Sequence, residues 1–451
     1  MRTPVLYLAL LTLLPVASAA GAAAKLSASP VDAYVRPYVD TRNFSGVLLV
    51  ARDGKPVFAR AYGFANFKRR DPNTLQTRFH IASMSMQYTA AAALRLIMAK
   101  KLTLDTPESE FVRGLPNGDS ITVRHLLTQT SGIRDINGLA DYDDILKRHQ
   151  TPASLVERIR HMPADRKPGT VKGEEHSAYN LLALIIERRT GLPFPLAVKK
   201  LVFDPLKMTS SGIDDDGPTA RIRAASGHAP LGVTGVEPAQ VIHWSAKAGN
   251  ASAYTTAGDH FRFVEGMFRG NFLSPALRAE VFDLSRRSGF GWFKSNSVRF
   301  GEPVYSMNGR SPGFASALVV VPGKRLTVLA MSNVYASFPP DIAGDVAAMT
   351  LGLPYKPLQM KITADASSLA GLPANFKFAD DFYQSNAVLK VSAVNGEVSI
   401  AWPDGSHTPQ IPTTSDHYID RSYGVAVEAV RAPDGSIIQL RYDKFVGNRV
   451  R

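Results

Sequence analysis

Few residues in this chain have side chains and spacing suited to catalysis, and the most informative is a histidine beside two carboxylates. His176 follows Glu174 and Glu175 directly. Imidazole titrates near neutral pH, so a carboxylate two residues away could orient the ring or hold it charged. If His176 lies near Ser83, the two side chains could form a Ser–His dyad with Glu174 or Glu175 as the orienting acid. The alternative is a solvated acidic loop that contains one histidine.

The composition excludes several other kinds of catalytic centre. The chain has 451 residues and no cysteine, which excludes cysteine nucleophiles, thiolate zinc sites and iron–sulfur clusters. The other histidines, such as His80, His125 and His260, lack a metal-ligand spacing such as H-E-x-x-H. No predicted strand leads into a cofactor fingerprint or a glycine-rich phosphate loop. We therefore expect neither a metal nor an organic cofactor.

The positive charge of the chain is dispersed along the sequence. The formal net charge is +13, from 52 Lys+Arg against 39 Asp+Glu, and the basic residues occur as scattered pairs such as Arg69-Arg70. Dispersed charge favours loose attraction to anionic polymers or membrane surfaces. Without a recognition motif it does not indicate nucleic-acid binding. We expect a solvated basic surface and no nucleic-acid partner.

The first residues have the pattern of a secretory signal peptide. Arg2 precedes an apolar run from Val5 to Leu14, and Ala17-Ser18-Ala19 supplies the small residues of a cleavage site. The run is too short to span a bilayer stably, although a retained membrane anchor is the alternative. We expect residues 1–19 to be removed by cleavage near Ala19. The protein would then be periplasmic or secreted, with no transmembrane anchor.

The segments that must position these side chains indicate a sheet with helices around it. Four apolar segments predict strands, and they are Phe44 to Val50, Val57 to Ala61, Ala315 to Val321 and Arg325 to Ser332. Asp53-Gly54 between the first two predicts a hairpin. Helical spacing covers Ala90 to Lys101 and Asn180 to Arg189, and Gly191 is placed to end the second helix. Strands at both ends of a helix-rich middle predict an α/β (α+β) fold, an antiparallel sheet flanked by helices.

The composition changes after Gly352, and helical periodicity disappears. Short alternating segments follow, and the clearest are Val388 to Val394, Glu397 to Trp402, Gly424 to Val430 and Ser436 to Tyr442. Turn sequences such as Pro403-Asp404-Gly405 separate them. We expect a main domain over residues 31–352 and a small β-barrel or sandwich over 358–451. The aromatic residues Phe382, Tyr383 and Trp402 fit either core packing or a contact surface.

A series of short stretches carries a resemblance to a known superfamily. The stretches are Phe44-Ser45-Gly46, Thr77 to Ser83, Ile121 to Gly132, Pro168-Gly169-Thr170 and Pro312-Gly313-Phe314. In order and spacing they resemble the serine β-lactamases and penicillin-binding proteins. The likeness is greatest to the branch of class C β-lactamases, D,D-peptidases, D-aminopeptidases and related esterases. It covers roughly residues 31 to 350 and implies a β-lactamase/transpeptidase-like main domain, with a small β-barrel appended as in many exported members.

The resemblance also implies that three catalytic clusters are altered. The S-x-x-K motif reads Ser83-Met84-Ser85-Met86, so methionine stands where the family has the lysine that accepts the serine proton. The tyrosine and asparagine of Y-x-N fall on Glu174 and His176. The basic residue of K-T-G or H-x-G falls on Met307 in Met307-Asn308-Gly309. A thioether has no useful basicity, and a positioned proton-transfer group typically contributes about 10²–10⁴ in rate.

These substitutions favour an exported, catalytically impaired serine-hydrolase homologue, a pseudoenzyme whose old active-site cleft binds a small peptide, ester or cell-wall fragment. Met86, Met307, Asn308 and Gly309 are then candidate ligand-binding residues, although methionines also fill irregular gaps in cores. The alternative is a hydrolase of esters, amides or peptides that acts through Ser83, with His176 or Glu174 as a replacement base. A domain without any ligand is the third possibility.

Overall fold

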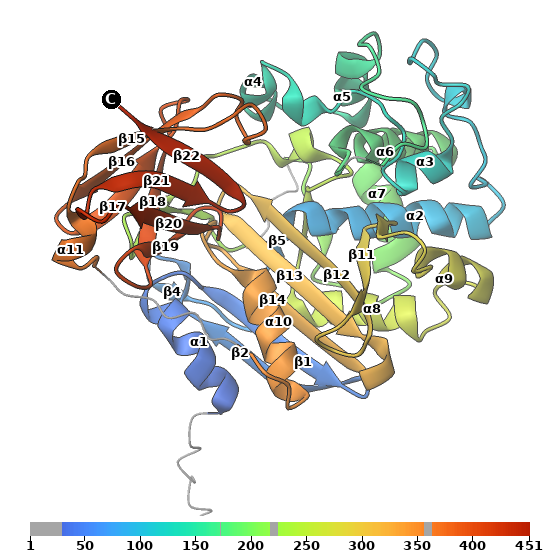
Figure 1. The fold of residues 1–451 in the computed structure, drawn as a ribbon. Helices are drawn as coiled ribbons and strands as arrows, with labels where there is room; N and C mark the ends of the chain where they lie inside the picture. The colour runs from blue at the N-terminus through green and yellow to red at the C-terminus, as the bar shows by residue number, and fades with distance from the viewer. Residues whose placement is uncertain (1–28, 172, 217–223, 356–362) are drawn as a thin grey trace, which may run out of the picture.

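The computed structural model describes residues 29–171, 173–216, 224–355 and 363–451. It contains a large sheet with helices on both faces and a closed barrel at the C-terminal end (Figure 1). The predicted signal peptide, residues 1–19, lies outside the described residues. Within the described ranges, no helix has the length and apolar character needed to cross a membrane.

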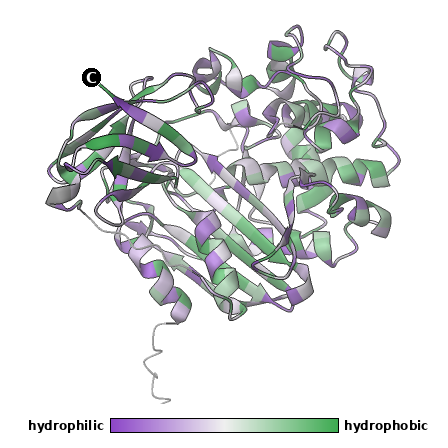
Figure 2. Cartoon of the chain, in the orientation of Figure 1, coloured by the Kyte–Doolittle hydropathy of each residue, from purple (hydrophilic) through white to green (hydrophobic). Residues whose placement is uncertain are grey.

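A seven-stranded antiparallel sheet has the strand order β10-β11-β12-β13-β14-β1-β2. Its strands are β1 (Gly46–Arg52), β2 (Lys55–Tyr62), β10 (Ser288–Gly289), β11 (Trp292–Ser297), β12 (Glu302–Ser311), β13 (Phe314–Val321) and β14 (Leu326–Ser332). Every residue of β13 and β14 is buried, and Figure 2 shows how hydrophobic these central strands are. The predicted hairpin is confirmed, because Asp53 and Gly54 both have positive φ, 54° and 74°. The predicted antiparallel sheet flanked by helices is likewise confirmed.

Alternate residues of the central strands face two separate cores. On one face, Leu48 and Val328 pack with α1 (Pro30–Asp40) and α10 (Pro339–Thr350). On the other face, Leu49 and Leu329 join a larger core with the remaining helices of this part. These helices are α2 (Met86–Met98), α3 (Val123–Leu127), α4 (Tyr142–Leu146), α5 (Pro152–Ile159), α6 (His176–Thr190), α7 (Phe194–Val198), α8 (Ala257–Phe268) and α9 (Pro275–Val281).

The two predicted helices are present with different starting points. The second ends as predicted, because Gly191 is left-handed (φ 69°) and its N–H donates to the Glu187 carbonyl. The first is α2, which begins at Met86, four residues before the predicted Ala90. Its first turn is wholly buried, so packing fixes a start that alanine-rich periodicity does not reveal.

The C-terminal region closes into an eight-stranded antiparallel barrel with strands in sequence order, after the short helix α11 (Ala366–Leu369). The strands are β15 (Ala374–Lys377), β16 (Val388–Val394), β17 (Glu397–Ala401), β18 (His407–Pro412), β19 (His417–Asp420), β20 (Ala426–Arg431), β21 (Ile437–Tyr442) and β22 (Phe445–Val450). The predicted β-rich C-terminal region is therefore confirmed as a barrel. Four of its strands match the four alternating segments singled out in the sequence.

A buried arginine joins the barrel to the sheet-containing part. The Arg421 side chain is fully buried and donates from Nε to the Asn43 side chain at 2.7 Å. It also donates to the backbone carbonyls of Gly235, at 2.8 Å, and of Arg42, at 3.3 Å. A buried guanidinium is tolerated only when its donors are satisfied. These hydrogen bonds fix where the barrel sits.

Candidate functional site

Ser83 lies at a sharp turn that opens helix α2. The turn is the 3-10 segment η1 (Ala82–Ser85), and it follows β5 (Phe79–His80), which pairs with β9 (Ala253–Thr255). Ser83 is partly exposed, whereas its neighbours Ala82 and Met84 are buried. Within the described part of the chain, the Ser83 hydroxyl makes no hydrogen bond. The fold therefore presents this hydroxyl on a turn whose flanks are anchored in the core.

The turn is strained at Ala82 and is held in place by two hydrogen bonds. Ala82 has φ of 49°, a left-handed conformation that is strained for a residue with a Cβ and persists only where surrounding contacts enforce it. The Ser85 hydroxyl accepts a hydrogen bond from the Ala253 N–H at 2.9 Å. The Ser316 hydroxyl donates to the Ile81 carbonyl at 2.9 Å. Strands β9 and β13 thus clamp the turn from two sides.

Strand β12 passes directly beside Ser83. A Cβ on Gly309 would lie 2.3 Å from the Ile81 carbonyl oxygen and 2.8 Å from the Ser83 nitrogen. Only glycine fits this approach, because real Cβ contacts do not come so close. Of the other predicted residues of this strand, Asn308 is exposed and Met307 is buried. The structure therefore brings Met307-Asn308-Gly309 to the serine turn.

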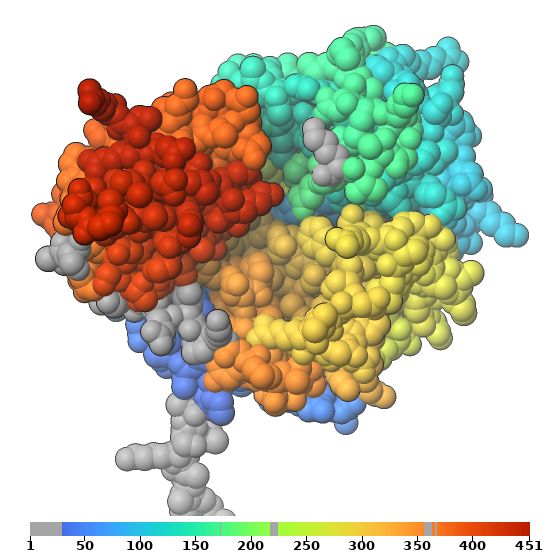
Figure 3. Space-filling model, viewed as in Figure 1, coloured from blue at the N-terminus to red at the C-terminus, as the bar shows by residue number. Residues whose placement is uncertain are grey.

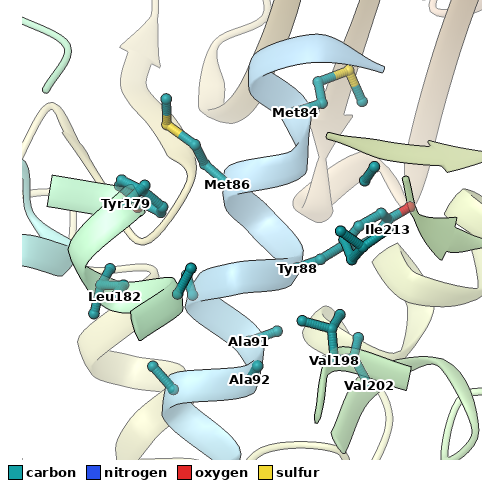
Figure 4. Packing of buried hydrophobic residues seen from close by; sticks show 14 of the residues in the cluster. Met84, Met86, Tyr88, Ala91, Ala92, Tyr179, Leu182, Val198, Val202 and Ile213 are labelled. Carbon is teal, nitrogen blue, oxygen red and sulfur yellow. The ribbon is translucent and has the colours of Figure 1, made fainter. Parts of the chain in front are cut away.

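Met86 and Met307 both belong to the main hydrophobic core. Met86 is fully buried and Met307 is 2% exposed. Figure 4 shows Met86 extending from the start of α2 on the side that also faces Tyr179. Gln129 donates from Nε2 to the Met86 sulfur at 3.5 Å. These contacts agree with methionines that fill space, and they leave little methionine surface for a ligand.

His176 begins α6 and is held between two carboxylates. Its backbone N–H and its Nδ1 both contact the Asp135 carboxylate, at 3.0 and 3.2 Å, and its Nε2 lies 3.5 Å from Glu174. Burial alone would lower the pKa of His176, but the hydrogen bonds and charges of Asp135 and Glu174 outweigh it and raise the pKa to about 9. The ring is therefore an imidazolium at neutral pH. In that form both nitrogens donate and neither accepts a proton.

Asp135 is ionised in this arrangement. Burial opposes its charge, but hydrogen bonds from the His176 side chain and from the backbone of Asn137 lower the pKa of the carboxyl below its usual range. Asp135 and His176 are 41 positions apart in sequence. Sequence reasoning missed Asp135 because no local pattern brings it to the histidine.

Glu175 does not orient His176. It is 2% exposed, and its carboxylate accepts hydrogen bonds from the Ser131 N–H at 2.9 Å, the Ser131 hydroxyl at 2.7 Å and the Gly132 N–H at 3.1 Å. It also forms a buried ion pair with Arg166. The solvated acidic loop considered from sequence is therefore wrong for Glu175, since a ring of donors compensates its burial.

His80 lies three residues before Ser83, at the end of β5, and its side chain also has a carboxylate partner. Its Nε2 lies 2.9 Å from the Asp214 carboxylate, and its ring stacks on Trp244 with centroids 3.8 Å apart. Asp214 and Trp244 are further residues near the serine turn that the sequence did not reveal. Within the described ranges, no group of three His, Asp or Glu side chains could hold a metal ion.

The two candidate bases, His176 and Glu174, are paired with each other. A serine hydroxyl is a poor nucleophile near neutral pH unless a neighbouring group takes its proton. The residue three positions after Ser83 is the buried Met86, and the candidate histidine His176 is paired with Asp135 and Glu174. Figure 3 shows a hollow on one face of the molecule, between the barrel in red, the helical part in green and cyan, and the segments drawn in yellow and orange.

Comparisons with known proteins agree with this architecture. A family model described as Beta-lactamase matches residues 31–350. Penicillin-binding protein 4* of Bacillus subtilis (strain 168) is 24% identical over 315 residues, which cover 65% of this chain and 69% of that protein. Esterase EstB of Burkholderia gladioli is 30% identical over 306 residues, 60% of this chain and 76% of that protein. An octameric penicillin-binding protein homologue from Pyrococcus abyssi superposes with a TM-score of 0.65 at 20% identity, over 92% of this chain and 98% of that chain.

Proposed function

Because the chain belongs to the beta-lactamase family, we propose that it is a catalytically impaired serine-hydrolase homologue that binds peptide or acyl ligands beside Ser83. The relatives support the ligand class, since one similar protein is named a penicillin-binding protein and another an esterase. The turn at Ser83 and the close approach of Gly309 remain as a frame for such a ligand. The proposal separates binding, which is retained, from turnover, which is lost.

The observation that carries this proposal is the pairing of His176. Asp135 and Glu174 occupy its two nitrogens, and the ring has a pKa of about 9. A general base near neutral pH must be unprotonated. His176 would have to lose a proton, and its Nε2 would have to leave Glu174, before it could accept a proton from Ser83.

The second candidate function is hydrolysis through Ser83 with a rewired base, His176 or Glu174. The partial exposure of Ser83, between buried neighbours, favours it, because a nucleophile must be reachable. This mechanism requires Glu174 to leave His176 in the presence of substrate.

One set of assays distinguishes the two functions. Mature protein and Ser83→Ala are incubated with a fluorescent penicillin and with a p-nitrophenyl ester, and adducts are located by mass spectrometry. If the protein is catalytically impaired, no adduct forms on Ser83 and both proteins hydrolyse the ester equally. Turnover that is lost in Ser83→Ala and in His176→Ala or Glu174→Gln would instead establish the rewired hydrolase.

Binding is measured separately by calorimetry with a peptide that ends in two D-alanines and with an uncleaved acyl analogue. We expect saturable binding to both the natural chain and Ser83→Ala, because the proposal needs no covalent step. The triple change Met86→Lys, Glu174→Tyr and Met307→His restores the family pattern and should bring back acylation. A chain that binds none of these ligands, in either form, would refute the ligand-binding half of the proposal.

We further propose that the protein is exported and acts in the periplasm or outside the cell. The charge, apolar run and small residues of positions 1–19 support this. Cell fractionation with N-terminal sequencing of the mature protein tests it. Cleavage near Ala19 is the expected result, and retention of the full N-terminus in the cytoplasm would contradict it.

A further inference from the structure

An aromatic pocket in the C-terminal barrel lies outside the serine site. The cavity has a volume of about 410 Å³, which falls in the range of roughly 300–1,000 Å³ that is usual for small-molecule sites. Four of its seven lining residues are aromatic, and they are Tyr383, Trp402, Tyr423 and Tyr442. Trp402 and Tyr442 are almost completely buried, whereas Tyr383 and Tyr423 are 58% and 46% exposed. Exposed tyrosines beside buried rings indicate a surface that core packing alone does not explain.

The rings surround a space. Trp402 meets Tyr442 at 90° with centroids 5.4 Å apart, and meets Tyr423 at 78° and 5.9 Å. Tyr383 meets Tyr442 at 82° and 6.3 Å. Rings that share one flat plane suit the stacking of a sugar, whereas these rings are inclined to one another around the cavity that they line. The negative faces of aromatic rings attract cations, and cages of this kind bind organic ammonium groups.

The charge of the pocket agrees with its shape. Among the described residues that line it, Asp404 alone is charged, although the whole chain carries a formal charge of +13. Hydrogen bonds from the hydroxyl and the N–H of Ser406 lower the pKa of Asp404, so the carboxylate is ionised at neutral pH. A second carboxylate, Asp443, accepts a hydrogen bond from the Tyr383 hydroxyl at 2.8 Å and fixes that ring. The pocket therefore combines aromatic faces with negative charge.

The nearby arginine does not neutralise this charge. Arg310, on β12, does not line the cavity, and it donates to the backbone carbonyls of Ser422 and Ser337. Its guanidinium also lies over the Tyr335 ring, with 5.3 Å between its central carbon and the ring centroid. It fixes the loop that carries Tyr423.

We propose that this pocket is a second ligand site, which binds a small molecule or side chain bearing an organic ammonium group. The ammonium would contact the faces of Trp402 and Tyr423 and lie near the Asp404 carboxylate. This site is independent of the proposed function at Ser83, because none of its residues belongs to the serine turn. Its ligand can bind whether or not Ser83 reacts.

The chain offers a matched control for this site. Asp404 and Asp434 occupy identical Pro-Asp-Gly-Ser turns, in which the aspartate accepts from the serine N–H at 2.9 Å and from the serine hydroxyl at 2.7 Å. Asp434 does not line the cavity. Asp404→Asn and Asp434→Asn therefore remove the same charge from the same turn geometry, and only the first alters the pocket.

The test uses the full chain with choline and tetramethylammonium as probes, measured by calorimetry and by tryptophan fluorescence. We expect saturable binding, and weaker binding by about tenfold for 3,3-dimethylbutanol, the neutral isostere of choline. Asp404→Asn and Tyr423→Leu should each weaken choline binding by about fivefold or more, whereas Asp434→Asn leaves it unchanged. Unchanged circular dichroism and melting temperature confirm that the variants are folded.

Three outcomes would overturn the proposal. Equal affinity for choline and its neutral isostere would identify a merely apolar pocket. If Asp404→Asn and Asp434→Asn weaken choline binding equally, the overall charge of the protein and not the pocket explains the binding. Binding of a disaccharide such as cellobiose, with no binding of either ammonium probe, would identify a saccharide site instead.

Discussion

The pairing of His176 makes the stability of the protein depend on pH in a defined direction. The folded-state pKa is about 9, against 6.5 for the free side chain. Because the pKa of His176 is raised in the folded state, its protonation stabilises the folded protein fully below about pH 6.5. This stabilisation is lost as the pH rises through about 9. One pKa unit corresponds to about 1.4 kcal/mol, so the whole contribution is at most about 3.5 kcal/mol. Solvent at the 20% of the side chain that remains exposed reduces this value.

The perturbation that isolates this contribution is His176→Gln, which removes the titratable charge but keeps hydrogen-bonding capacity. The free energy of unfolding of both proteins is measured by urea denaturation at intervals from about pH 6 to about pH 10. We expect the natural chain to lose up to about 3.5 kcal/mol of its advantage over the variant across this range. His149→Gln, at an exposed histidine, serves as the control and should show a flat difference.

Nuclear magnetic resonance of the imidazole gives an independent readout, because the chemical shift of His176 follows its own protonation. The expected midpoint is about pH 9. A midpoint at the usual value near 6.5, together with a stability difference that does not vary with pH, would refute the two-carboxylate pairing. It would also free the imidazole to act as a base and so favour the rewired hydrolase.

Three further predictions concern contacts that fix the site and the barrel. Gly309→Ala should lower the free energy of unfolding by about 2–4 kcal/mol, because the new Cβ would collide with backbone atoms beside Ser83. Gly258→Ala is the control and should leave the free energy of unfolding unchanged, because its Cβ would meet open space. Thermal denaturation compares the two variants. Glu175→Gln should lower the free energy of unfolding by about 2–4 kcal/mol, because it breaks the hydrogen bonds of a buried carboxylate. The exposed Glu157→Gln should lower it by less than about 0.5 kcal/mol. Equal urea midpoints for the two variants would contradict this prediction. Arg421→Met should leave buried backbone carbonyls without donors and weaken the attachment of the barrel to the sheet-containing part. Limited proteolysis detects this as cleavage between the sheet-containing part and the barrel. An unchanged digestion pattern would show that other contacts hold the barrel.

Local signals in the sequence account for the parts of the fold that were predicted. Asp53-Gly54 specified a hairpin because few other residues accept two successive positive φ angles. Gly191 ended α6 for a similar reason. In the barrel, β18 escaped prediction because Pro409 and Pro412 interrupt its pattern, although both residues lie within the strand.

The candidate site was less predictable because its decisive contacts join distant residues. Glu174 and His176 could be singled out by type and spacing, but Asp135 enters only through folding. Glu175 was indistinguishable from its neighbour in the sequence. Its burial depends on donors from Ser131 and Gly132, more than forty positions earlier. Adjacent glutamates thus have opposite roles, one facing a histidine and the other anchoring a loop.

Strand β12 has a mechanical consequence. Gly309 rests against the backbone of Ser83, and the next residue, Arg310, grips the loop that carries Tyr423. Neighbouring residues of a single extended strand therefore contact both the turn at Ser83 and the loop beside the aromatic pocket. The positions of these two segments are set by the same strand, although the chemistry of the two sites is separate.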